Sequence, residues 1–191
     1  MVSINEAKKA IQNGKIVIYP TDTVWGMGCD PFNQKAVDEL FRIKGKKRNG
    51  LSIMLNNVNL IYDFCEVNKK AKKIVDEFLP GPITLILKSK KDFAKGVTRN
   101  GNIAIRIPLN KTALDLAANQ PIITTSVNLH GEKIARNLDE AKEKFGSNCH
   151  YLDGEEPKGI ESTIIDLTEN KPEITRIGAL YSTILEGMLE S

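Results

Sequence analysis

The stretch from Ile16 to Gly28 reads IVIYPTDTVWGMG, and the interpretation of the whole chain starts from it. Its first four residues are apolar and mostly β-branched, which is typical of a buried strand. Pro20 ends this strand because proline has no N–H group for the hydrogen-bond ladder. Open α/β sheets bind ligands where strands end, so residues 21–23 are candidates for a binding site. The alternative is an ordinary loop in which their side chains bond local N–H groups.

Length and composition indicate one globular domain spanning residues 1–191. The chain is 41% hydrophobic and 27% charged, which is ordinary for a domain with a well-buried core. No apolar run is long enough to cross a bilayer, and residues 1–15 lack the apolar segment of a secretion signal. The three cysteines are far apart and fit neither a disulfide framework nor a zinc site. We therefore expect a cytoplasmic protein without a membrane contact.

The net charge of +3 is unevenly distributed along the chain. Five cations lie between Arg42 and Arg48, and further lysine clusters lie at 69–73 and 88–91, whereas 153–161 is acidic. Basic clusters of this kind indicate phosphate partners, either a nucleotide or RNA. Solvated helix ends and loops would produce the same pattern.

Capping residues and apolar periodicity predict helices and strands that interleave along the chain. Helices are expected over 3–13, 33–44, 58–64, 68–79, 111–118, 138–145 and 181–189. Strands are expected over 15–19, 51–55, 83–87, 102–107, 121–125, 149–152, 163–167 and 174–177. Because several strands follow one another late in the chain, we predict an α/β (α+β) fold with a twisted, open, mixed sheet flanked by helices.

The polar residues at predicted strand ends suggest a particular kind of chemistry. Neither His130 nor His150 belongs to a recognisable nucleophilic or metal-binding pattern, and the usual phosphate-loop motifs are absent from the sequence. Arg106 and Arg176 lie in apolar strands, where an arginine is costly to bury unless an anion meets it, the alternative being an edge strand facing water. Hydroxyls, amides and cations can run phosphoryl or nucleotidyl transfer by positioning and charge stabilisation.

Seven segments, spread in order over nearly the whole chain, carry a family resemblance. They are Tyr19–Gly28, Ile43–Lys46, Pro80–Thr84, Arg106–Pro108, Ser126–Asn128, Ser162–Asp166 and Arg176–Gly178. Together they resemble the YrdC-like (TsaC) threonylcarbamoyl-AMP synthases. The resemblance implies a YrdC-like fold with a concave basic cleft, in the short, single-domain form.

The resemblance also implies an activity. Such enzymes are nucleotidyltransferases that combine L-threonine, bicarbonate and ATP into threonylcarbamoyl-AMP and pyrophosphate with the help of Mg²⁺. A downstream transferase then modifies the adenosine beside the anticodon of tRNA. Contact with tRNA or double-stranded RNA is a further implied property.

Site residues follow from the resemblance by position. The implied threonine site consists of Thr23, Met54, Arg106, Thr124 and Ser162. The implied ATP site consists of Lys44, Lys46, Arg48, Asn49, Ser126, Asn128, Ile134 and Arg176. Catalysis is implied for Lys44, Lys46, Ser126 and Asn128, with Ser126 and Asn128 on the phosphates or on the Mg²⁺ that the phosphates bind.

One part of the resemblance departs from the family pattern. Lys46 stands where relatives have an arginine, and Arg48 is the alternative for that arginine's role, with Asn49 facing the nucleotide. The distinction matters because lysine cannot form the bidentate fork of a guanidinium.

Two other functions compete with the synthase. A non-catalytic module could use the basic clusters to bind RNA during tRNA or ribosome maturation, and its affinity would then fall steeply with salt. The same pocket could instead serve carbamoyl transfer from carbamoyl phosphate, although family domains with that role usually lie within much longer chains.

Overall fold

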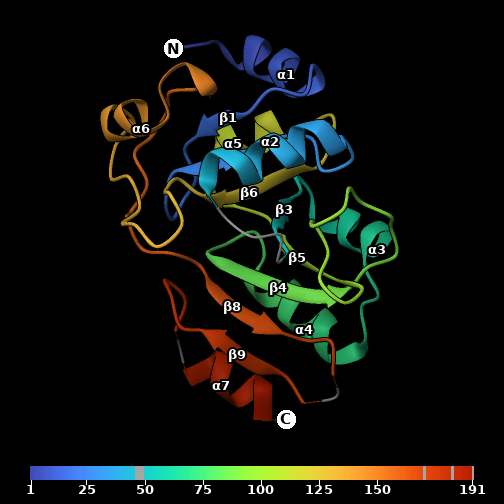
Figure 1. Ribbon diagram of the computed structural model, residues 1–191. Coiled ribbons are helices and arrows are strands. Elements are labelled where there is room, and N and C mark those ends of the chain that lie inside the picture. Colours follow the sequence, from blue (N-terminus) through green and yellow to red (C-terminus); the bar gives the residue numbers. More distant parts are fainter. Residues whose placement is uncertain (46–49, 170, 182, 191) are drawn as a thin grey trace.

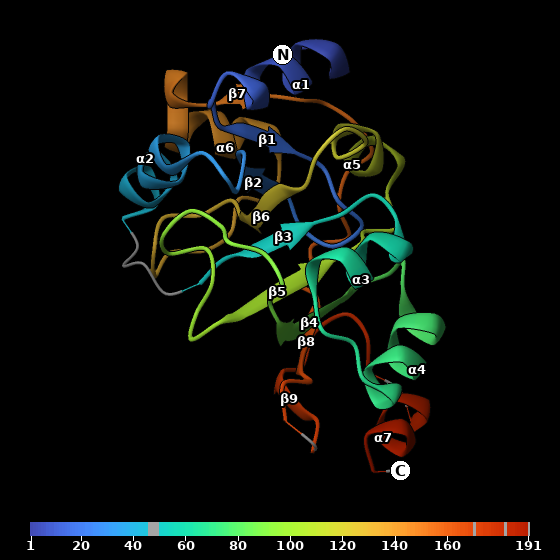
Figure 2. The same ribbon diagram turned by 90° about the vertical axis from the view of Figure 1, so that its right-hand side faces the viewer.

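A nine-stranded sheet forms the centre of the computed structural model, which describes residues 1–45, 50–169, 171–181 and 183–190 (Figure 1). The strands are β1 (Val17–Tyr19), β2 (Gly26–Gly28), β3 (Ser52–Met54), β4 (Ile83–Lys88), β5 (Asn102–Arg106), β6 (Ile122–Ser126), β7 (His150–Tyr151), β8 (Thr163–Asp166) and β9 (Glu173–Arg176). Their order across the sheet is β7-β1-β2-β6-β3-β5-β4-β8-β9. The two termini lie at opposite ends of this order (Figure 2).

The sheet is mixed, as predicted. Strand pairs β1–β7, β3–β5 and β4–β8 are parallel, and the other neighbouring pairs are antiparallel. The helices around it are α1 (Ile4–Gln12), α2 (Gln34–Lys44), α3 (Ile61–Phe64), α4 (Lys69–Phe78), α5 (Lys111–Leu116), α6 (Leu138–Phe145) and α7 (Thr183–Glu190), with 3₁₀ turns at Val58–Leu60 and Gly146–Asn148. The prediction of an α/β fold with a mixed sheet is therefore confirmed.

Short polar side chains start most of these helices. Ser3 and Glu6 form the predicted capping box of α1, and Asn33 accepts the Ala36 N–H at the start of α2. Asparagine caps α4, α5 and α6 in the same way. Each cap satisfies an N–H group that has no partner inside the helix.

Strand β2 was not predicted, and its glycines explain why. Gly26 and Gly28 have low strand propensity, yet β2 pairs antiparallel with β1 and β6. A Cβ atom on Gly28 would lie 1.7 Å from the Ile123 carbonyl oxygen. Residues 17–28 therefore form two paired strands joined by residues 20–25. Glycine is required at position 28 because β2 and β6 approach closely there.

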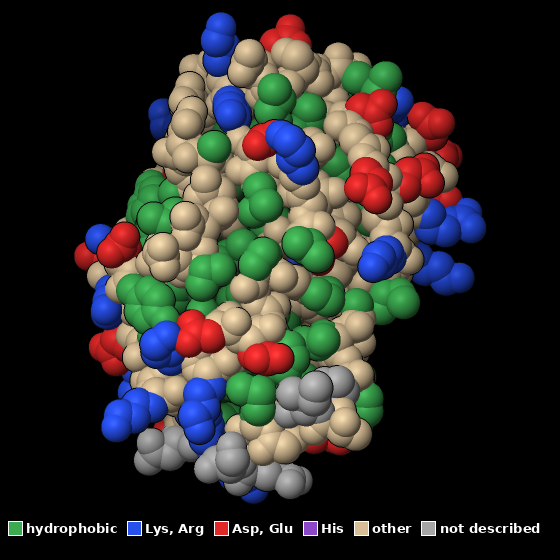
Figure 3. All heavy atoms as spheres, turned by 180° about the vertical axis from the view of Figure 1, so that it is seen from behind, with side chains coloured by type: hydrophobic (Ala, Val, Ile, Leu, Met, Phe, Trp, Pro, Cys, Tyr) green, Lys and Arg blue, Asp and Glu red, His purple; other side chains and the backbone are tan. Residues whose placement is uncertain are grey.

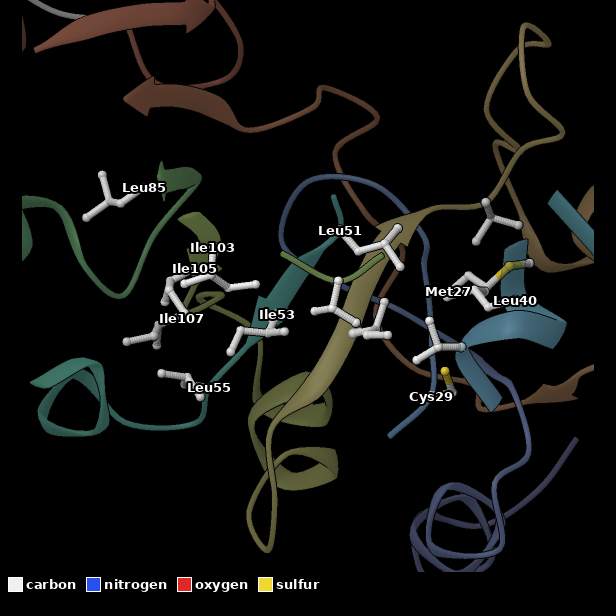
Figure 4. Close-up of a cluster of buried hydrophobic side chains, with 14 of the residues drawn as sticks. Met27, Cys29, Leu40, Leu51, Ile53, Leu55, Leu85, Ile103, Ile105 and Ile107 are labelled. Carbon is white, nitrogen blue, oxygen red and sulfur yellow. The ribbon is translucent and has the colours of Figure 1, made fainter. Parts of the chain in front are cut away.

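One face of the sheet is covered by the larger hydrophobic cluster. Ile53, Ile105 and Ile123 are in register on β3, β5 and β6 and belong to this cluster together with Leu40 of α2. Figure 4 shows the cluster extending from Leu85 past the central strands to α2. Residues of α2, α4 and α6 pack here.

The opposite face is only partly apolar. Tyr19, Met54 and Ile122 form a second cluster with residues of α1 and α5. Beyond this cluster the same face carries Ser52 and Thr124, which are paired in register. The period of two along each strand thus places apolar side chains on one face and polar ones on the other, and a site can form only on the polar face.

The predicted basic cleft is not evident in the surface charge seen from behind. In Figure 3, Lys and Arg side chains alternate with Asp and Glu side chains and do not form one continuous basic patch on that face. In the described parts of the chain, no helix has the length and apolar character needed to span a bilayer.

The three cysteines predict a stability effect at alkaline pH. Cys29, Cys65 and Cys149 are buried free thiols, and burial raises the pKa of each to about 12. Unfolded thiols lose their protons above a pH of about 8.5 while the folded ones keep theirs. The free energy of unfolding should therefore fall as the pH rises from about 8.5 towards 12, by about 2 kcal/mol per thiol at pH 10.

Urea unfolding midpoints measured between pH 7.5 and 10 test this expectation. The matched control is the variant with all three cysteines replaced by alanine, which should be less stable but show a flatter decline over this range. An equally steep decline in the control would assign the effect to other groups.

Candidate active site

A cavity of about 600 Å³ opens on the polar face of the sheet. Backbone segments from β2, β3, β4, β5, β6 and β8 converge on it. Its polar lining consists of Thr21, Ser52, Thr84, Arg99, Asn100, Asn102, Arg106, Thr124, Thr125, Ser126, Glu161, Ser162, Asp166 and Arg176. The volume suits a ligand the size of a nucleotide.

Strand register gives this cavity two ends. Ser52 pairs with both Ala104 and Thr124 at the middle of the floor. Arg106 lies two residues beyond Ala104 in one direction, and Asn102 lies two residues before it in the other. With a rise of about 3.3 Å per residue, these two side chains are about 13 Å apart along β5. We call these the Arg106 end and the Asn102 end.

At the Arg106 end, Arg106 Nη2 donates to Asp22 Oδ1 over 2.6 Å. The side chains are only 7% and 10% exposed, respectively, so the carboxylate is the partner that the sequence predicted for a buried arginine. Burial lowers the pKa of Arg106, and the nearby Asp22 charge opposes that shift. Arg106 Nε is buried without a hydrogen-bond partner among the described residues. The guanidinium therefore has a donor not used by the protein.

A hydroxyl network adjoins the Arg106 end. Thr84 Oγ1 and Ser162 Oγ lie 2.8 Å apart, and Arg176 donates from Nη2 to Ser162 Oγ over 3.1 Å and from Nε to the Ser162 carbonyl over 3.0 Å. Arg176 Nη1 also donates to Glu161 Oε1 over 2.7 Å. This end can bind a carboxylate ligand, because it presents hydroxyls and guanidinium groups, while its own two carboxylates are paired with Arg106 and Arg176.

Ser126 lies towards the Asn102 end, since β6 runs antiparallel to β3. Its Oγ donates to Asn128 Oδ1 over 2.8 Å. Lys44 Nζ donates to the Ser126 carbonyl over 2.5 Å, to the Asn128 carbonyl over 2.9 Å and to Asn128 Oδ1 over 3.2 Å. The buried Lys44 ammonium thus holds the 126–128 turn in place.

Five of the predicted site residues line the cavity, and five others among the described residues do not. The cavity is lined by Arg106, Thr124, Ser126, Ser162 and Arg176. Among the described residues that do not line it are Thr23, Met54, Lys44, Asn128 and Ile134. The predicted Lys46, Arg48 and Asn49 lie outside the described residues.

Two of these differences have clear physical reasons. Thr23 is fully buried, with its hydroxyl 3.1 Å from Thr21 Oγ1, and Thr21 lines the cavity instead. Met54 lies on the same sheet face as Ser52 but packs with Tyr19 in the second hydrophobic cluster. Thr21 and Ser52 line the cavity, and the Thr21 hydroxyl is used locally, since it donates to the Val24 carbonyl and accepts from the Thr23 N–H. The roles of Thr23 and Met54 at the threonine site remain predictions.

Several lining residues were missed from the sequence. Ser52, Thr84, Asn102 and Asp166 lie on the cavity face of β3, β4, β5 and β8, and alternation from neighbouring predicted residues would have identified some of them. The contact of Asp22 with Arg106 joins residues 84 positions apart. No local pattern indicates such a pairing.

Comparisons with known proteins agree with the fold. The family profile for Sua5, YciO and YrdC proteins, described as "Telomere recombination", matches residues 9–178. A Methanocaldococcus jannaschii relative is 38% identical over 86% of this chain and 80% of its own. The threonylcarbamoyl-AMP synthase of Pyrococcus abyssi is 32% identical over 89% of this chain and 52% of its own, so the present chain spans about half of that relative.

A solved structure extends the similarity to three dimensions. The crystal structure of P. abyssi Sua5 complexed with L-threonine has a TM-score of 0.90 and 31% identity, covering 97% of this chain and 57% of that one. Together with the profile match over most of the chain, this confirms the resemblance inferred from the seven segments: the chain belongs to the Sua5/YciO/YrdC family.

Proposed function

We propose that this chain is a threonylcarbamoyl-AMP synthase, a nucleotidyltransferase that uses L-threonine, bicarbonate and ATP. The observation that carries the proposal is that Arg106, Thr124 and Ser162 line a nucleotide-sized cavity, in a fold whose P. abyssi relative has been solved with L-threonine. Relatives named threonylcarbamoyl-AMP synthase support the same activity. A tRNA-modifying transferase would consume the product.

Threonine would bind at the Arg106 end. Its carboxylate would accept hydrogen bonds from the Arg106 guanidinium, which lines the cavity. The Thr84 and Ser162 hydroxyls, 2.8 Å apart, would bond its polar groups. Asp22 keeps the guanidinium in place from the other side. A guanidinium suits this role because its fork matches a carboxylate.

The chemistry would proceed in two steps. The threonine amine attacks the bicarbonate carbon, forming an N-carboxylate and releasing water. An oxygen of that carboxylate then attacks the α-phosphorus of ATP, and the bond from this phosphorus to the bridging oxygen breaks, so that pyrophosphate leaves with the electron pair. Positioning and charge stabilisation are the main contributions that a protein makes to such a transfer.

Nucleotide binding is proposed for the other end of the cavity. Ser126 and the turn to Asn128 would face the phosphates, and Lys44 would act through this turn, which its ammonium holds. Lys46 or Arg48 would supply further charge, with Asn49 and Ile134 near the nucleotide. Arg176 would contact the threonine end or the nucleotide through the guanidinium that bonds Ser162.

The contacts of Asn128 favour Mg²⁺ binding through the substrate phosphates over direct binding to Asn128. Asn128 Oδ1 accepts from Lys44 Nζ over 3.2 Å and from Ser126 Oγ over 2.8 Å, and the adjacent ammonium makes it a poor ligand for a second cation. Mg²⁺ usually keeps several waters and binds through substrate phosphates. We therefore propose that it enters with ATP and that Ser126 Oγ is the protein oxygen nearest to it.

The alternatives have weaker support. HypF structures share the fold, but the HypF solved with phosphate and nucleotide is only 22% identical and the match covers 29% of it, so this likeness concerns the fold alone. The relatives named threonylcarbamoyl-AMP synthase do not favour a non-catalytic RNA-binding module.

A product assay tests the proposed function. Purified protein given L-threonine, bicarbonate, ATP and Mg²⁺ should release pyrophosphate and form threonylcarbamoyl-AMP, detected by mass spectrometry. Omitting threonine or bicarbonate should stop both. Folded protein, verified by circular dichroism, that yields no adenylate under these conditions would contradict the proposal.

A further inference from the structure

We infer that Arg99 is a triphosphate-binding residue, placed at the Asn102 end of the cavity to contact the β- and γ-phosphates of ATP. Arg99 lies outside all seven segments that carry the family resemblance. The inference rests on the proposed function in so far as ATP is the nucleotide.

Three arginines line the cavity among the described residues: Arg99, Arg106 and Arg176. Arg106 is paired with Asp22, and Arg176 is paired with Glu161. Within the described ranges, the Arg99 guanidinium takes part in no hydrogen bond or ion pair. Arg99 is therefore the lining arginine whose charge is left for a ligand.

The backbone fixes where this charge lies. Arg99 forms a bridge with Asn102 through two hydrogen bonds of 2.9 Å, which places it just before β5. The Leu51 N–H donates to the Val97 carbonyl over 2.9 Å, and a Cβ on Gly50 would lie 3.3 Å from Arg99 Cβ. Arg99 is thus held beside the chain that enters β3.

Charge favours a polyphosphate at this end of the cavity. At the Arg106 end, the guanidinium groups of Arg106 and Arg176 are balanced by the carboxylates of Asp22 and Glu161. At the Asn102 end, the charge of Arg99 has no such partner among the described residues. Asp166 also lines the cavity, but its Oδ1 accepts from Thr168 N and Oγ1.

The chemistry of the side chain fits the role. A guanidinium binds phosphate oxygens through two parallel N–H donors. Because Arg99 is exposed, its side chain can contact a phosphate without breaking a hydrogen bond or ion pair within the protein.

Titration calorimetry with three probes tests the inference. For Arg99→Ala, the Kd for ATP should rise by about 10- to 100-fold, the usual value of a hydrogen bond to a charged group. The Kd values for AMP and L-threonine should stay within about twofold of wild type, because the contact is to the outer phosphates. Arg99→Lys should recover part of the ATP affinity by keeping the charge without the fork.

Lys72→Ala is the matched control, since it also removes one exposed positive charge, but from α4 and away from the cavity. It should leave all three affinities unchanged. Wild-type ATP affinity in Arg99→Ala, or equal losses for all three probes, would overturn the inference. If ATP affinity depends on Arg99 but the wild type makes no threonylcarbamoyl-AMP, then the proposed function fails and the inference stands.

Discussion

Replacing Arg106 by alanine is expected to abolish L-threonine binding and to lower the free energy of unfolding by about 3–5 kcal/mol. The substitution leaves the Asp22 carboxylate, 10% exposed, without the guanidinium that it contacts over 2.6 Å. An uncompensated buried charge is costly because the low-dielectric interior cannot replace the lost partner. The same guanidinium is the proposed ligand of the threonine carboxylate.

Two measurements separate these effects. Urea unfolding gives the stability of each variant, and calorimetry gives its threonine affinity. The double variant Asp22→Ala with Arg106→Ala should be more stable than the sum of the single effects predicts, since no charge is then left alone. It should still not bind threonine.

Arg106→Lys keeps the test informative if the alanine variant does not fold. Lysine preserves the positive charge beside Asp22 but not the bidentate fork, so the stability loss should be smaller than the loss of threonine affinity. Threonine binding of wild-type strength in Arg106→Lys would contradict the proposed role. Additive single effects in the double variant would contradict the ion-pair argument.

Gly28→Ala is the second substitution with a large expected effect. Its Cβ would lie 1.7 Å from the Ile123 carbonyl oxygen and 2.8 Å from the carbonyl carbon, so β2 and β6 could not keep their present separation. The Ile123 N–H donates to the Cys29 carbonyl at the same place. We expect a loss of at least about 4 kcal/mol, within the range of mutations that disrupt packed cores, which is a large part of a typical domain stability.

Gly187→Ala is the matched control. Gly187 lies in α7, and a Cβ there meets nothing within 4 Å. Alanine should stabilise the helix by about 0.5–1 kcal/mol, so the same chemical change has opposite signs at the two sites. Thermal unfolding of both variants measures this. Equal stability of Gly28→Ala and wild type would show that the sheet can separate at β2 without cost.

Most elements of the fold could be predicted because their signals are local. Asparagine caps and apolar stripes predicted α2, α4 and α6, and proline predicted the ends of β1 and β5. Strand β2 escaped prediction because its glycines are required by a neighbour distant in sequence, not by local propensity.

The residues that line the cavity could likewise be predicted only in part. Arg106, Thr124, Ser126, Ser162 and Arg176 were predicted and line it. Thr23 was also predicted at this site, and its hydroxyl lies 3.1 Å from that of Thr21. The directions of these two side chains depend on how residues 20–25 turn between β1 and β2, and the sequence has no signal for that turn.

From IVIYPTDTVWGMG and the six other segments, the sequence alone determined the family, the mixed α/β fold and five cavity residues. Only the tertiary structure decided that Asp22 neutralises Arg106, that Lys44 holds the 126–128 turn, and that the Arg99 charge faces the cavity. The physical reason is the range of the interactions involved. Helix caps and strand patterns depend on residues a few positions apart, whereas the Arg106–Asp22 ion pair and the Lys44–Ser126 contact join residues more than 80 positions apart once the sheet is assembled.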